Sequence, residues 1–432
     1  MKVGLVYPSG SRRTTYSSSI PELRRFFDSN PHLPVFFLPS LSLLTLAACT
    51  PADVEIRLLD ERIAPLDFDE PFDVVGITLM TEQAVRGYQI ARTFRDRGVF
   101  TVLGGIHATT LSHEAARHAD CVVIGEAEST WPALLDDFRR GSARPLYGAA
   151  HPVRLERSPV PRYDLLPPGA YPLMPAQTTR GCPHDCSFCT VTKVFGPRYR
   201  TKTVAQVVRE VEAVQAASRT RRVVFNDDNM FVNRRKTREL LRALIPLRIR
   251  YFAQSDISIA DDPELLELMQ RSGCVTVFIG FESLVPENLA SLQDAGWKRS
   301  RLATYSGACK RIQSHGIQVL GAFILGFDHD DSAVFERLID FTLKNDILGQ
   351  YHFLTPFPAT RVRDELVAQG RLAAHDDRWD LYSCFDLVFE PRGLSRAELE
   401  TGLLGVYQAV YADAAHAKRS RRMIEYLKRR SG

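Results

Sequence analysis

The chain has 432 residues, more than one hydrophobic core usually organises, so we expect two or three domains. Its contents of 45% hydrophobic and 25% charged residues are ordinary for a globular protein, and a net charge of +4 gives no case for nucleic-acid binding. Eight cysteines are too sparse, and too clustered in function, for a disulfide framework, so we expect a reducing compartment, with the cytoplasm as the default.

The first 140 residues alternate short apolar runs with segments of helical periodicity. The runs expected as buried strands are 2–7, 54–59, 73–79, 99–103 and 121–124, and the helical segments are 82–97 and 129–140. This alternation predicts a doubly wound parallel sheet with helices on both faces. The apolar stretch 35–48 is too short to cross a bilayer, so we expect a buried helix and no transmembrane segment.

Small and polar residues follow the predicted strands, where ligands of such sheets bind. They are Thr78, Met80, Gly104, Gly105, His107, Gly125 and Glu126. No G-x-G-x-x-G motif follows the first strand, so a dinucleotide is poorly supported. Glycines at two of these turns allow a large ligand to approach the backbone closely.

The run Gly-Gly-Ile-His-Ala-Thr at 104–109, together with Ile-Gly-Glu-Ala-Glu at 124–128, resembles the cobalamin (B12)-binding domains that precede many radical S-adenosylmethionine (SAM) domains. The resemblance covers residues 1–145 and implies that the turn residues above contact cobalamin. The Asp-x-His-x-x-Gly motif that supplies a cobalt ligand in many B12 proteins is absent. His107 is then either close to the corrin or a hydrogen-bonded turn residue, and a vestigial scaffold domain stays open as an alternative.

Seven prolines between 151 and 175 predict a linker, assigned to 146–172. Cys182, Cys186 and Cys189 follow it, spaced so that their thiolates converge on one iron–sulfur cluster. Three ligands leave one iron of a four-iron cluster open for chemistry, as in catalytic metal sites. Structural zinc would need a fourth ligand, and His184 lies too tightly inside the loop to serve.

The pattern Cys-x3-Cys-x-Phe-Cys, in which Phe188 is the aromatic residue, resembles the cluster loop of the radical SAM superfamily. The resemblance implies a [4Fe–4S] cluster whose open iron binds SAM, and reductive cleavage of SAM to a 5′-deoxyadenosyl radical. Such an enzyme needs an electron donor, for example flavodoxin or ferredoxin.

A second alternating series predicts strands at 175–179, 223–226, 251–255, 275–281, 318–325 and 351–355, with amphipathic helices such as 203–217 between them. Six strands with helices match the partial (βα)6 barrel of the radical SAM fold, assigned to 173–370. Reactive groups of such barrels lie at the carboxyl ends of the strands, where the cysteine loop falls.

Residues that end these strands match positions that hold SAM in the superfamily. They are Asp227, Asp228, Gln254, Ser255, Glu282, Gly321 and Gly326. Asp227 and Asp228 take the place of the motif for the SAM amino group, although Asp228 also fits a helix N-cap. Ala359 replaces a glycine of the sixth-strand motif, which puts a left-handed turn there in doubt.

The segment 371–432 resembles the helical C-terminal extension of enzymes from hopanoid and chlorophyll pathways. Trp379, Tyr382 and Phe385 fit a substrate cavity or simple core packing. The basic tail from Lys418 to Arg430 fits a solvated helix, with contact to a membrane surface as the alternative.

The sequence is therefore interpreted as a cobalamin-dependent radical SAM enzyme that methylates an unactivated carbon of a small molecule or lipid, either a hopanoid, a tetrapyrrole or an antibiotic precursor. No single side chain is assigned as the catalytic group, because the cofactors carry the difficult steps. A radical cyclisation, ring contraction or rearrangement without methyl transfer is the first alternative. A cobalamin-binding regulator or scaffold is the non-enzymatic one.

Overall fold

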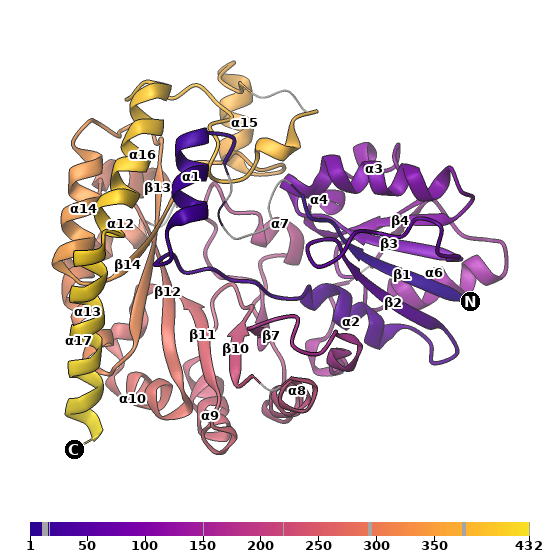
Figure 1. Cartoon of the computed structure of the whole chain (residues 1–432), viewed down its shortest axis with the longest axis horizontal. Coiled ribbons are helices and arrows are strands. Elements are labelled where there is room, and N and C mark those ends of the chain that lie inside the picture. Colours follow the sequence, from indigo (N-terminus) through magenta and orange to yellow (C-terminus); the bar gives the residue numbers. More distant parts are fainter. Residues whose placement is uncertain are drawn as a thin grey trace.

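The computed structural model describes residues 1–10, 16, 18–149, 151–218, 220–292, 296–373 and 377–431. Two parallel sheets of six strands each dominate it, the first at the right of Figure 1 and the second at the left and centre. Within the described residues, no helix is long and apolar enough to cross a membrane.

The N-terminal sheet has the strand order β2-β1-β3-β4-β5-β6, and every neighbouring pair is parallel. Its strands are β1 (Lys2–Tyr7), β2 (Glu55–Asp60), β3 (Val74–Thr78), β4 (Phe100–Gly104), β5 (Cys121–Ile124) and β6 (Leu146–Gly148). The doubly wound parallel sheet is confirmed, and the predicted strands lie within a residue or two of the observed ones. The strand β6 lies in the segment expected to be linker, because three residues carry too little pattern to be recognised.

Helices cover both faces of this sheet (Figure 1). One face packs against α2 (Leu41–Cys49) and α6 (Thr130–Arg139), whose Leu43, Ala47 and Trp131 share a core with the strands. The other face packs against α3 (Ala84–Arg95), which follows the short turn η1 (Thr81–Gln83), and against α4 (Gly105–Thr110) and α5 (Ser112–Ala115). The predicted buried helix in 35–48 is thus confined to α2, and the residues before Leu41 run irregularly.

The second sheet has the order β14-β13-β12-β11-β10-β7, so its strands follow one another around an open barrel. They are β7 (Met174–Ala176), β10 (Arg222–Phe225), β11 (Arg250–Ser255), β12 (Cys274–Glu282), β13 (Gln318–Leu325) and β14 (Leu348–Phe353). All neighbours are parallel, which confirms the partial (βα)6 barrel. A separate hairpin of β8 (Thr179–Arg180) and β9 (Arg200–Thr201) stands at its mouth, with α7 (Val191–Phe195) between the two strands.

The helices of the barrel are α8 (Val204–Ala217), α9 (Arg234–Leu244), α10 (Pro263–Ser272), α11 (Pro286–Leu292), α12 (Trp297–Arg301), α13 (Tyr305–Ser314), α14 (Val334–Lys344) and α15 (Arg361–Ala368). Short 3-10 turns are η2 (Leu155–Arg157), η3 (Tyr163–Leu165), η4 (Ile245–Leu247), η5 (Ile257–Asp261) and η6 (Leu302–Thr304). A capping box between Thr203 and Gln206 begins α8, and Val207, Val211 and Val214 bury its apolar face.

The N-terminal segment contributes to the barrel as well as to its own sheet. Helix α1 (Pro21–Ser29) lies beside α16 (Arg396–Val410), and the chain then crosses to α2 (Figure 1). Along this crossing, the ring of Phe36 contacts that of Phe252 on β11, with 4.7 Å between centroids. The N-terminal segment is therefore part of the barrel core.

The C-terminal extension is formed by η7 (Trp379–Leu381), α16 and α17 (Asp413–Ser431), which confirms its helical character. Trp379 and Tyr382 are buried against α3 and α5 of the N-terminal region, and the Trp379 indole donates to Glu114 Oε1 at 2.8 Å. Phe385 packs with Phe27 of α1. All three aromatics are almost completely buried, so they belong to the core that joins the domains.

Replacing Trp379 tests this junction. Trp379→Ala removes a fully buried indole, and we expect the free energy of unfolding to fall by about 3–5 kcal/mol. Trp379→Phe keeps most of the apolar contact but loses the hydrogen bond to Glu114, so its free energy of unfolding should fall by only about 1–2 kcal/mol. Urea unfolding measures both, and an alanine variant as stable as wild type would contradict the core assignment.

Candidate active site

The cysteine loop lies at the mouth of the barrel, between β8 and β9. Gly181, which opens the loop, has a φ of 88°, and a Cβ there would lie 2.6 Å from the carbonyl oxygen of Arg198. A side chain at this position would therefore be strained in conformation and would clash with backbone. The Cys189 amide donates to the Cys186 carbonyl at 3.0 Å, which closes a tight turn between two of the three thiols.

The ends of two strands, β10 and β11, and two helices, α11 and α15, hold this loop in place. The Gly181 amide donates to Asp228 at 3.2 Å, and a ring nitrogen of His184 lies 3.3 Å from Asp256 Oδ2. The Ser187 amide donates to the carbonyl of Leu292, while its own carbonyl accepts from Val362 at the start of α15. These contacts place the loop at the carboxyl ends of the strands, as predicted from the sequence.

The three cysteines are partly buried thiols, and none of the eight cysteines forms a disulfide. Burial raises the pKa of Cys182 to about 11 and that of Cys189 to about 12, so both are protonated at neutral pH until a metal displaces the proton. In the part of the chain that is described, no group of three or more His, Cys, Asp or Glu is placed to hold a single metal ion. Three thiols on one loop without a fourth ligand fit a cluster instead, because each thiolate ligates a different iron.

The two aspartates after β10 have different environments. Asp227 is 1% exposed and accepts hydrogen bonds from the amide and hydroxyl groups of Thr178 and Thr179, and its burial raises its pKa to about 7. Its oxygens thus fix the backbone that leads into the cluster loop. Asp228 lies against Gly181 and is more open. The N-cap of α9 is Asn233, so the N-cap interpretation of Asp228 is wrong.

Glu282, at the end of β12, is paired with a lysine that the sequence had not indicated. Its backbone has a φ of 67° next to an irregularity in the pairing with β13, a strained conformation for a residue with a side chain. Lys298 donates to Glu282 Oε1 at 2.7 Å and to the Gly280 carbonyl at 2.8 Å. Burial alone would lower the pKa of Lys298, but Glu282 and, to a smaller extent, Cys186 raise it, so Lys298 is a cation near the cluster loop.

Of the other residues expected to contact SAM, Gln254, Ser255 and Gly326 lie at strand ends, Gly321 lies within β13, and Phe188 lies in the cysteine loop. Gln254 and Ser255 end β11, and Phe188 packs against the barrel core. A Cβ on Gly321 would lie 2.9 Å from the rings of Phe281 and Phe323, so this glycine makes room for aromatic packing. Gly326 has a φ of 96° after β13 and donates its amide to Asp330.

Ala359 follows β14 in the sixth-strand motif. It adopts a φ of 64°, so the left-handed turn persists there although a methyl group replaces the hydrogen of glycine. The doubt about this turn is therefore resolved in favour of the left-handed geometry, held by contacts around the turn such as the hydrogen bond from Thr360 Oγ1 to the Phe357 carbonyl.

A cavity of about 490 Å³ lies between the carboxyl edge of the N-terminal sheet and the mouth of the barrel. Six residues predicted at the turns line it: Thr78, Met80, Gly104, Gly105, Gly125 and Glu126. Gln177, Arg180 and Asn226 line it from the barrel side. A Cβ on Gly104 would meet nothing closer than 3.8 Å and one on Gly125 nothing within 4 Å, so two glycines leave the backbone open toward a large, partly apolar ligand. These features fit the corrin-binding surface expected from the sequence.

His107 does not line this cavity. His107 lies in α4, and its ring is completely buried. A ring nitrogen lies 2.9 Å from the Tyr88 hydroxyl, and the ring packs against Trp379. Of the two alternatives for His107, a hydrogen-bonded residue at the turn agrees with its environment, and a position close to the corrin does not. The sequence placed His107 near the glycine turn correctly, but the direction of its side chain depends on the C-terminal extension, which no local pattern reveals.

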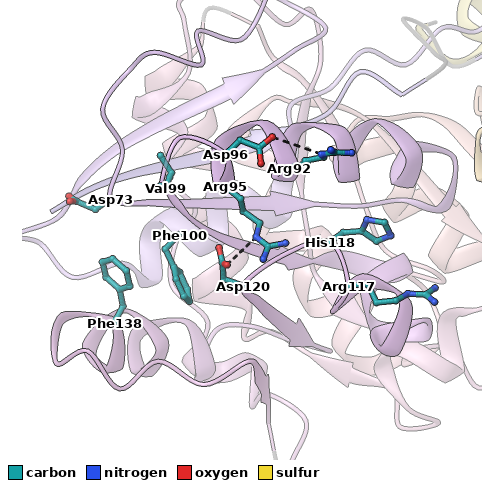
Figure 2. Close-up of a pocket in the computed structure, with 11 residues that line it drawn as sticks. Asp73, Arg92, Arg95, Asp96, Val99, Phe100, Arg117, His118, Asp120 and Phe138 are labelled. Atoms are coloured by element: carbon teal, nitrogen blue, oxygen red, sulfur yellow. Dashed lines mark hydrogen bonds and ion pairs between the residues drawn. The ribbon is translucent and has the colours of Figure 1, made fainter.

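Figure 2 shows a second hollow, of about 750 Å³, at the opposite edge of the N-terminal sheet. Its walls include Arg92 and Arg95 from the last turn of α3, and Asp120, which directly precedes β5. Arg95 pairs with Asp120 at 3.1 Å and Arg92 with Asp96 at 3.9 Å, as the dashed lines mark. Ligands of parallel sheets bind at the other edge, so this hollow is not the active site.

Removing one thiol tests the cluster assignment. Cys186→Ala should lose the iron and the visible absorbance of an anaerobically reconstituted [4Fe–4S] protein, because two thiolates cannot hold the cube in place. Cys309→Ala is the matched control, since this thiol is buried in α13 and away from the loop, and it should keep the cluster. Iron analysis that finds full loading in Cys186→Ala would contradict the assignment.

Comparisons with known proteins agree with this architecture. Residues 176–342 match the radical SAM superfamily and residues 36–135 match the B12 binding domain. The bacteriochlorophyllide d C-12(1)-methyltransferase of Chlorobaculum tepidum is 34% identical over 88% of this chain and 84% of its own length. The hopanoid C-2 methylase of Rhodopseudomonas palustris is 27% identical over 79% of this chain and 67% of its own.

The structure of the radical S-adenosylmethionine methyltransferase TsrM from Kitasatospora setae, with cobalamin and a [4Fe–4S] cluster bound, has the same fold. The TM-score is 0.68 at 17% identity, over 95% of this chain and 88% of that one. Neither the rearrangement enzyme nor the non-enzymatic scaffold is favoured by these relatives. The thiol loop at the barrel mouth, the cavity behind it and these likenesses lead to one conclusion: the chain belongs to the cobalamin-dependent radical SAM methyltransferases, which use a [4Fe–4S] cluster, SAM and cobalamin.

Proposed function

We propose that this methyltransferase acts on an unactivated carbon of a chlorophyll-type tetrapyrrole. One observation carries the general part of the proposal: the carboxyl edges of both parallel sheets border one cavity, and the thiol loop stands beside it. When bound, the cluster with SAM supplies the radical that removes hydrogen from such a carbon, and cobalamin supplies the methyl group. The substrate class rests on the bacteriochlorophyllide relative, which is more similar than the hopanoid one.

The side chains of this chain bind and orient in that proposal. Asp228, Gln254, Ser255 and Glu282 are assigned to SAM, and the glycine turns at 104–105 and 125 to the corrin. Lys298 neutralises Glu282 and brings a positive charge close to the cysteine loop. The domain divisions at 145, 172 and 370 belong to the same proposal.

An electron donor such as flavodoxin or ferredoxin is proposed as a partner, because SAM cleavage consumes an electron that this chain does not generate. The cytoplasm is the proposed location. Its reducing conditions suit thiols that must stay free to bind iron.

Transfer of a labelled methyl group tests the substrate class. The anaerobically reconstituted protein, with cobalamin, SAM labelled in its methyl group and a chemical reductant, is incubated with bacteriochlorophyllide d or with a hopanoid. We expect label in the tetrapyrrole and none in the hopanoid. Label in the hopanoid alone would overturn the substrate class and keep the reaction, whereas label in cobalamin that reaches neither compound would count against both compounds.

Gly104→Val tests the corrin assignment. The φ of Gly104 is −146°, an extended conformation that any residue adopts, so the valine brings no backbone strain. Its two methyl groups would project into the cavity. We expect cobalamin affinity to fall at least about tenfold, because a steric cost of about 1.4 kcal/mol is enough for a tenfold loss. Gly405→Val is the control, because a Cβ there meets nothing within 4 Å, so it is similarly unobstructed, but it lies in α16. Equal cobalamin binding by both variants, measured by equilibrium dialysis, would contradict the assignment.

A further inference from the structure

Two arginines face each other at the two ends of the cluster loop. Arg180 and Arg200 are register partners in the antiparallel pair β8–β9, one directly before the loop and the other directly after it. Like charges at directly opposite positions destabilise such a pair. A hairpin of only two residues per strand has little else to hold it, so it needs a negative charge from elsewhere.

That charge comes from the N-terminal sheet. Arg180 Nη1 lies 2.6 Å from Glu126 Oε1, and Arg200 Nη1 lies 2.8 Å from Glu126 Oε2. Glu126 follows β5, directly after Gly125. One carboxylate of the B12-binding domain therefore binds both ends of the loop that carries the three cysteines.

The Glu126 carboxylate has no capacity left for a cofactor. Oε1 accepts from Arg180 and Arg200, and Oε2 accepts from Arg200 and from the Val153 amide at 3.0 Å. An ionised carboxylate has about four acceptor positions, and three nitrogens make four contacts with them here, because Arg200 Nη1 bridges the two oxygens. Although Glu126 lines the cavity, it presents no free oxygen to a corrin.

Burial makes the contact between Glu126 and the two arginines costly to break. The side chains of Glu126, Arg180 and Arg200 are 5%, 10% and 15% exposed. If these groups moved apart, little water could reach them to replace the lost ion pairs. The arginines therefore strongly prefer one position relative to Glu126. Glu128 also pairs with Arg180, at 2.6 Å, but it contacts only that end of the loop, whereas Glu126 contacts both ends.

We propose that Glu126 is a positioning residue that sets the distance between the iron–sulfur cluster and cobalamin by holding Arg180 and Arg200. The inference rests on the two-cofactor function described above. Glu126 contacts neither the cluster nor, by its own hydrogen bonds, the corrin. Its effect is on the relative placement of two sites that must share one substrate.

The test is Glu126→Gln, which keeps the shape of the side chain and removes its charge. Glu70→Gln is the control, because Glu70 also pairs with two cations, Lys2 and Arg57, but does not line the cavity. Each protein is loaded with the cluster and with cob(II)alamin. Electron paramagnetic resonance then measures how strongly the reduced cluster accelerates spin relaxation of Co(II), an effect that falls steeply with distance. This readout needs no substrate.

We expect Glu126→Gln to keep wild-type iron and cobalamin contents and to show a weaker, heterogeneous relaxation effect. In the methylation assay it should release severalfold more 5′-deoxyadenosine per methyl group transferred. Glu70→Gln should resemble wild type in both measurements. If Glu126→Gln does not fold, Arg200→Gln, which removes one of the two cations that Glu126 binds, takes its place with the same expectation.

Identical relaxation and an identical product ratio in the Glu126→Gln variant and wild type would overturn the proposal. Loss of iron alone, with relaxation unchanged in the loaded fraction, would also overturn it, because Glu126 would then only brace the loop. A wild-type protein that binds no cobalamin would instead remove the function on which the inference rests, so the two failures are distinguishable.

Discussion

The structure depends on carboxylates at the ends of parallel strands that satisfy the backbone and side chains of one irregular loop. Asp227 fixes the residues before the loop, Asp228 binds its first amide, and Asp256 faces His184 within it. An irregular loop near a barrel mouth would otherwise leave polar groups unpaired, at a cost of about 1–3 kcal/mol each. Because these acids hold the loop, the three thiols are available for iron.

Contacts between residues far apart in sequence also join the two halves of the molecule. The N-terminal sheet supplies Glu126 to the ends of the loop, and the C-terminal extension supplies Trp379 to the other side of the N-terminal domain. The first segment of the chain runs back across the barrel, where α1 meets α16. The cavity between the sheets is thus bounded by parts that three separate contacts hold together.

Much of this could be predicted from the sequence, because continuous apolar strands, helical periodicity and the cysteine spacing are local patterns. The parallel arrangement of both sheets, the positions of most strands and the cavity-lining turns at Gly104 and Gly125 followed from them. Pairings between distant residues could not be predicted. Lys298 beside Glu282, Asp227 turned inward and His107 buried under Trp379 each depend on an element remote in sequence, and the short strand β6 has too few residues to show a pattern.

The metal and corrinoid contents of the chain, purified without oxygen and supplied with iron, sulfide and cobalamin, test the account most directly. Two cofactors on the two sheets predict about four iron atoms and about one cobalt per chain, with the optical bands of both. A chain that takes up the iron but no corrinoid, even in excess, would contradict the central claim that the two sheets serve one cobalamin-dependent radical reaction.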